Sequence, residues 1–148
     1  MTRFTRRRRE RILLDTGPLY ALLDARDQHY ANAVSTLERL DEMRAEVLCA
    51  YPAALETHRL MLTRSRVDVS RTHELIIEVS GEFPFVMATD EDGQRALRFL
   101  LRYDDQKISL TDATIAAMSI RLKASVMTFD RRQGHFRLMG ANVLEVGL

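Results

Sequence analysis

Short β-like runs alternate with longer helical patterns along this 148-residue chain. The β-like runs cover residues 11–14, 46–50, 85–88, 125–129 and 142–145. Such alternation is typical of βαβ units, in which successive strands are parallel and helices cover both faces of the sheet. The sequence therefore predicts an α/β fold of three layers, α/β/α, with a central, mainly parallel sheet of about five strands.

The segments between these runs carry helical signals. Apolar residues recur at helical spacing in 30–40 and 75–79. Pro52 stands where a helix tolerates proline best, so a helix is expected from there to about Leu62. Two capping boxes predict further helix starts, Thr89 with Asp92 and Ser109 with Asp112.

Positive charge is concentrated at the start of the chain. Residues 1–11 hold six arginines and one acid, a charge of +5, whereas the whole chain carries only +1. We expect a basic, flexible tail over 1–11 and a single domain over 12–148. Such a tail attracts phosphate groups, which makes Arg6, Arg7, Arg8 and Arg9 candidate nucleic-acid contacts. An inert tail explains the same residues equally well.

The composition excludes several classes of protein. The one cysteine, Cys49, permits no disulfide within the chain, which is consistent with a cytoplasmic location. No Cys/His cluster has the spacing of a zinc site. No apolar run approaches the ~18 residues of a membrane span, so we expect no membrane partner.

Four acidic residues are predicted to meet at one edge of the sheet. Asp15 and Asp130 each end a predicted strand, Glu56 lies one turn into the helix after the second strand, and Asp112 lies at a helix start. The carboxyl ends of parallel strands share one edge. Each acid alone has a local explanation, as a helix cap or a solvated side chain. Together, four carboxylates repel one another and favour a hard cation, Mg²⁺ or Mn²⁺.

Other residues near these acids are secondary candidates. Thr16 and Thr128 lie beside predicted ligands and are candidate hydroxyl contacts, although turn and strand positions suit threonine in any case. Asp105 is a candidate accessory acid or an ordinary loop residue. Arg131 and Arg132 follow Asp130 and are candidate RNA contacts, since arginine binds phosphate well, or part of a solvated cationic face.

Three segments, in order, resemble the motifs of the PIN domain. The run ILLDTGPLYALLD at 12–24 is similar to the opening of that family, and SLTDA at 109–113 and MTFD at 127–130 are similar to its two later acidic motifs. Glu56 falls where the family has a glutamate on the helix after the second strand. The resemblance extends over nearly the whole chain beyond the basic tail.

This resemblance implies a metal-dependent endoribonuclease, often the VapC-type toxin of a type II toxin–antitoxin pair. It implies that Asp15, Glu56, Asp112 and Asp130 are both metal ligands and catalytic residues, with Mg²⁺ or Mn²⁺ as cofactor. One or two such ions can orient a phosphodiester and activate water. The implied partners are RNA, an antitoxin and a second copy of the chain.

Two alternative functions remain open from the sequence. A PIN-like fold can serve as a non-catalytic binding module, because fold alone does not determine function. An aspartyl phosphatase of the haloacid dehalogenase kind also begins with an aspartate after its first strand. Those enzymes have a second acid two residues later, and here that position is Gly17.

Overall fold

The structure is a computed structural model that describes residues 9–145, apart from the side chains of Asp130, Arg131 and Glu145. Its strands are β1 (Arg11–Leu14), β2 (Glu46–Ala50), β3 (Phe85–Val86), β4 (Ser125–Thr128) and β5 (Asn142–Glu145). They form one sheet in the order β3-β2-β1-β4-β5, and every pairing is parallel. The predicted α/β class and five-stranded parallel sheet are confirmed.

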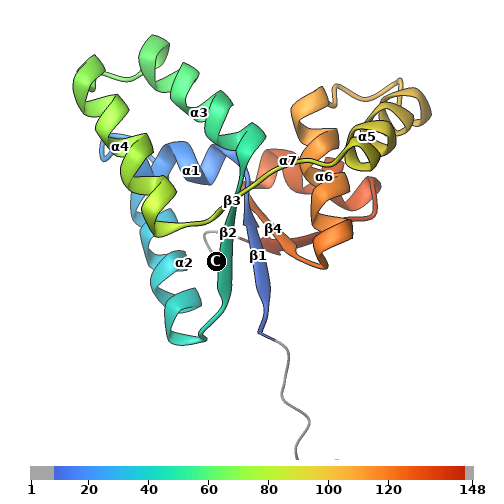
Figure 1. Cartoon of the computed structure of the whole chain (residues 1–148), viewed down its shortest axis with the longest axis horizontal. Coiled ribbons are helices and arrows are strands. Elements are labelled where there is room, and N and C mark those ends of the chain that lie inside the picture. Colours follow the sequence, from blue (N-terminus) through green and yellow to red (C-terminus); the bar gives the residue numbers. More distant parts are fainter. Residues whose placement is uncertain (1–8, 146–148) are drawn as a thin grey trace, which may run out of the picture.

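Helices cover both faces of the sheet (Figure 1). They are α1 (Thr16–Leu23), α2 (Tyr30–Glu42), α3 (Tyr51–Arg64), α4 (Val69–Glu82), α5 (Asp90–Arg102), α6 (Leu110–Leu122) and α7 (Asp130–Leu138). In Figure 1, α1, α2 and α4 lie on one side of the strands and α5, α6 and α7 on the other. This is the predicted three-layer arrangement.

The central strand β1 shows how the two cores form. Ile12 and Leu14 pack with Leu40 of α2 and Val79 of α4, whereas Leu13 packs into the cluster on the α5, α6 and α7 side. Ile12, Leu13 and Leu14 are all fully buried. Because successive side chains of a strand point to opposite faces, a continuous apolar run is what a sheet covered on both sides requires.

Two predicted strands end earlier than expected. We predicted a strand over 85–88, but β3 stops at Val86 because its pairing partner β2 ends at Ala50 and the next residue begins α3. The strand predicted over 125–129 stops at Thr128, and Phe129 is instead the N-cap of α7. Both differences occur where the backbone turns from strand to helix at the carboxyl edge.

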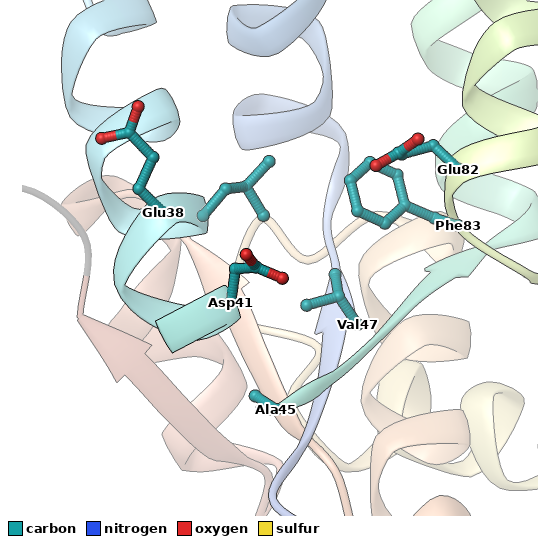
Figure 2. Close-up of a pocket in the computed structure, with 7 residues that line it drawn as sticks. Glu38, Asp41, Ala45, Val47, Glu82 and Phe83 are labelled. Carbon is teal, nitrogen blue, oxygen red and sulfur yellow. The ribbon is translucent and has the colours of Figure 1, made fainter. Parts of the chain in front are cut away.

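A pocket of about 380 Å³ lies at the opposite, amino end of the sheet. Figure 2 shows Val47 and Phe83 at this pocket, with the carboxylates of Glu38, Asp41 and Glu82 around it. Val47 is the second residue of β2, so the pocket is remote from the carboxyl ends of the strands. Within residues 9–145, no helix is both long and apolar enough to cross a membrane.

Candidate metal centre

Asp15 is the most buried acid at the carboxyl edge. It follows β1 directly and has no exposed surface. Although it occupies the N-cap position of α1, its side chain makes no capping hydrogen bond. The Thr128 hydroxyl donates to Oδ2 at 2.8 Å, and Oδ1 has no hydrogen-bond partner among the described residues. Helix capping therefore does not explain this aspartate.

The environment of Asp15 makes its negative charge unfavourable. Burial, followed by the charge of Asp112, raises the pKa of Asp15 from 3.8 to about 6, despite the opposing effects of the Thr128 hydroxyl, the backbone N–H of Thr16 and Arg132. At neutral pH the carboxylate is still ionised, and one of its oxygens is buried without a partner. A buried, unpaired anion costs free energy that a bound cation offsets.

Glu56 is positioned by a second threonine. It is half-buried on α3, and the Thr16 hydroxyl donates to its Oε2 at 3.1 Å. Thr16 is itself buried as the first residue of α1, which packs against α3. Thr16 and Thr128 thus each hold one of the predicted acids by a neutral hydrogen bond, which an ordinary turn or strand threonine need not do.

Asp112 differs from an ordinary capping residue. Its backbone N–H donates to the Ser109 hydroxyl at 3.0 Å, which is one half of the predicted capping box. Its carboxylate accepts a hydrogen bond from Nη1 of Arg132 at 2.7 Å. By contrast, Thr89 and Asp92 form both halves of their box at the start of α5. The carboxylate of Asp112 thus pairs with Arg132 of α7, whereas that of Asp92 completes its capping box and also accepts from Arg121 of α6.

Arg132 interacts electrostatically with all three of these acids. Burial acts to lower the pKa of this guanidinium, but the charges of Asp112, Asp15 and Glu56 outweigh it, so the pKa is raised. Three of the four predicted acids thus act on one arginine, Asp112 from α6, Asp15 from the end of β1 and Glu56 from α3. We expected Arg132 at most to contact RNA, and the sequence carried no signal of its bond to a residue 20 positions earlier.

The other predicted site residues either are exposed or have side chains that the structure does not describe. Asp130 is the first residue of α7, directly beyond Thr128 and Phe129, and its side chain and that of Arg131 lie outside the description. Asp105 is exposed in the turn between α5 and α6, and Arg9 is exposed before β1. Arg6, Arg7 and Arg8 lie outside the described residues.

One glycine near the site lies at a close approach between two helix starts. A Cβ atom on Gly17 would lie 3.1 Å from Cδ2 of Phe129, because the first turn of α1 packs directly on that ring. This contact ties the start of α1, after Asp15, to the start of α7, at Asp130. The sequence marked Gly17 only as part of a motif and did not indicate this contact.

The donor set fits a hard divalent cation, although it is not assembled around one point. Within residues 9–145, and with the side chain of Asp130 outside the description, no three His, Cys, Asp or Glu side chains lie close enough to hold one ion. The available oxygens are nevertheless carboxylates, which Mg²⁺ and Mn²⁺ prefer. Oδ1 of Asp15 is buried without a hydrogen-bond partner among the described residues, and the charge of Asp112 acts on the same carboxyl group.

Several solved structures are similar to this chain. VapC20 of Mycobacterium tuberculosis, a sarcin–ricin loop cleaving toxin, is similar with a TM-score of 0.70 at 22% identity, over 90% of this chain and 98% of that one. VapBC2 of Rickettsia felis, solved with a DNA fragment from its promoter, gives a TM-score of 0.72 at 13% identity, over 93% and 99% of the two chains. FitAcB of Neisseria gonorrhoeae gives 0.67 at 17%, over 90% and 96%.

At these identities the structural matches establish the fold alone. No curated protein sequence matches the chain significantly. The family described as the PIN domain matches residues 12–138, which include Asp15, Glu56, Asp112 and Asp130. This chain therefore belongs to the PIN domain family.

Proposed function

We propose that this protein is a metal-dependent endoribonuclease and the toxin of a type II toxin–antitoxin pair. The observation that carries the proposal is Asp15, which is fully buried beside Asp112 at the carboxyl edge and has an unpartnered oxygen. A structural role gives no reason for such a carboxylate, whereas a cation site does. Family membership supports the assignment, because the four acids lie within the matched region.

In this proposal Asp15, Glu56, Asp112 and Asp130 hold Mg²⁺ or Mn²⁺. A divalent ion in such a site supplies Lewis-acid polarisation of a phosphodiester and activation of water. Thr128 fixes Asp15 through Oδ2 and leaves Oδ1 available, and Thr16 fixes Glu56. These threonines orient the carboxylates in advance, which lowers the cost of assembling the site.

RNA is the proposed substrate, with cleavage in an unpaired loop. Exposed bases and a bendable backbone suit single-stranded segments better than a duplex. The similarity to VapC20, which cleaves the sarcin–ricin loop, is consistent with this choice. Arg131, the neighbour of Asp130, would supply attraction for phosphates near the acidic site, and the arginines of the tail, Arg6, Arg7, Arg8 and Arg9, would add a general attraction for RNA.

The proposed protein partner is an antitoxin that covers the acidic edge, with a homodimer as the assembled form. Several structural neighbours are toxin–antitoxin complexes, which supports this partner. Both RNA and antitoxin would be met in the cytoplasm. A protein encoded by a small adjacent gene should copurify with this chain and suppress its activity, and failure of any neighbour to bind would argue for a stand-alone nuclease.

The experiment that tests the activity uses an end-labelled stem–loop RNA. We expect the full chain to cut within the unpaired loop when Mn²⁺ or Mg²⁺ is present and to leave the RNA intact in excess EDTA. Cleavage that persists in EDTA would contradict the metal-dependent mechanism. An intact RNA under both conditions, across several loop sequences, would favour the non-catalytic binding module.

A further inference from the structure

Arg132 is a charged residue of the site that the proposed function does not yet use. Its guanidinium donates to Oδ1 of Asp112 at 2.7 Å. The Asp112 side chain is 5% exposed and that of Arg132 is 41% exposed, so the arginine reaches a buried acid from the protein surface. Removal of one partner from such a pair leaves an uncompensated buried charge.

We propose that Arg132 is the resident counter-cation of the acidic cluster and that it competes with the divalent ion for Asp112. This inference rests on the proposed metal site. It adds that the ion binds there by displacing Arg132 from Asp112. In the metal-free protein the guanidinium neutralises part of the charge of the cluster. When the ion binds, Asp112 leaves the guanidinium.

The hydrogen bonds of the three acids show why the competition falls on Asp112. Asp15 and Glu56 are held by neutral hydroxyls, from Thr128 and Thr16. A hydroxyl carries no net charge, so it can remain bound while another oxygen of the same carboxylate coordinates an ion. A guanidinium repels a divalent cation placed on the same carboxylate. Of the three described acids, Asp112 is the one bound by a charged partner.

The consequence is a metal affinity lower than the acids alone would give. The protein must break the pair between Arg132 and Asp112 before Asp112 becomes a ligand, and apparent affinity falls with the population of the competent state. The arginine thus stabilises the empty site and weakens its affinity for the ion.

The test is calorimetric titration of Mn²⁺ into the full chain. We expect Arg132→Gln to bind Mn²⁺ about tenfold more tightly than the wild type, because one repelling charge and one competing bond are removed. Arg132→Lys retains the charge without the planar fork and should lie between the two. Arg71→Gln is the matched control: it removes the same charge from an exposed pair on α4 and should leave affinity within roughly twofold.

Thermal melts in EDTA provide the second readout. Arg132→Gln should melt below the wild type without metal and recover when Mn²⁺ is added, whereas Arg132→Gln with Asp112→Asn should melt higher in EDTA than Arg132→Gln alone. A folded Arg132→Gln with wild-type Mn²⁺ affinity, or with an unchanged melt in EDTA, would overturn this inference and leave the proposed nuclease standing. Absence of Mn²⁺ binding by every protein, including the wild type, would overturn the metal site itself.

Discussion

The hydroxyl of Thr128 lies 2.8 Å from Oδ2 of Asp15, although the two residues are 113 positions apart. They meet because β1 and β4 are neighbouring parallel strands that end at the same edge. The bond holds one oxygen of a buried carboxylate and leaves the other unpartnered. A strand-ending aspartate is thereby held in one orientation, as the proposed role of a metal ligand requires.

Replacing Thr128 by valine tests this relationship. Valine has nearly the same shape but no donor, so we expect the pKa of Asp15 to rise above its value of about 6. The unpaired oxygen should lower the free energy of unfolding by about 1–3 kcal/mol. An NMR titration of the Asp15 carboxyl carbon measures the first effect and a denaturant melt the second. Thr128→Ser keeps the donor and should change neither greatly, and equal pKa values in Val and Ser variants would contradict the prediction.

The raised pKa of Asp15 predicts how stability depends on pH without metal. The pKa is about 6 in the folded protein and 3.8 in the unfolded chain, so the folded state holds the proton more tightly. Stability from this group therefore falls as pH rises from about 4 to about 6, and the loss is complete above that range.

The Asp15→Asn variant isolates this contribution. It should be more stable than the wild type at pH 7 in EDTA by about 3 kcal/mol, and no more stable near pH 3. The difference between the two proteins cancels other titrating groups. A difference that does not change between pH 4 and pH 7 would show that Asp15 is not a strained carboxylate.

Asp92 and Asp112 have similar local environments, so their Asn variants can separate an effect on stability from an effect on metal binding. Each is the third residue of its helix, is bound through its N–H to a Thr or Ser side chain, and pairs with an arginine. Arg121 and the capping box lower the pKa of Asp92 against the effect of burial. We expect Asp92→Asn to cost about 1–3 kcal/mol of stability and leave Mn²⁺ affinity unchanged.

The matching change at Asp112 should, in contrast, alter Mn²⁺ affinity. Asp112→Asn removes a proposed ligand and should weaken Mn²⁺ binding at least about tenfold, as measured by calorimetry. Equal Mn²⁺ affinities in the two variants would remove Asp112 from the site. Circular dichroism in EDTA confirms that both variants are folded before they are compared.

Gly17 and Gly93 give a second matched pair. Gly17→Ala would place a Cβ atom 3.1 Å from the Phe129 ring, so Phe129 must shift, and we expect a loss of about 1–3 kcal/mol. Gly93 lies inside α5 with open space around its Cα, so Gly93→Ala should gain about 0.5–1 kcal/mol. Chemical denaturation measures both, and a stable Gly17→Ala would show that the first turn of α1 does not depend on this contact.

The sequence predicted the fold well because its signals are local and repetitive. The bounds of β1, β2 and β5 follow from continuous apolar runs, and the capping box of α5 from Thr89 and Asp92. The end of β3 was wrong, because it depends on where its partner strand stops, which is a tertiary property.

The placement of the candidate acids could be predicted in part, and the contacts of their side chains could not. Asp15, Glu56 and Asp112 could be placed at one edge from topology alone. The hydrogen bond from Arg132 to Asp112 could not, because it depends on side-chain directions on two helices that pack only in the folded protein. Nothing in the order of residues distinguished that arginine from its neighbour Arg131.

The most direct test of the account is RNA cleavage by Asp15→Asn in the presence of Mn²⁺. Asn keeps the shape and can still accept from Thr128, but it removes the charge that the ion requires. We predict that cleavage falls at least about 100-fold, the upper end of what even an outer-shell partner costs when it is lost. Asp105→Asn, which removes an exposed carboxylate from a turn, should cleave like the wild type. Wild-type cleavage by a folded Asp15→Asn would contradict the central claim.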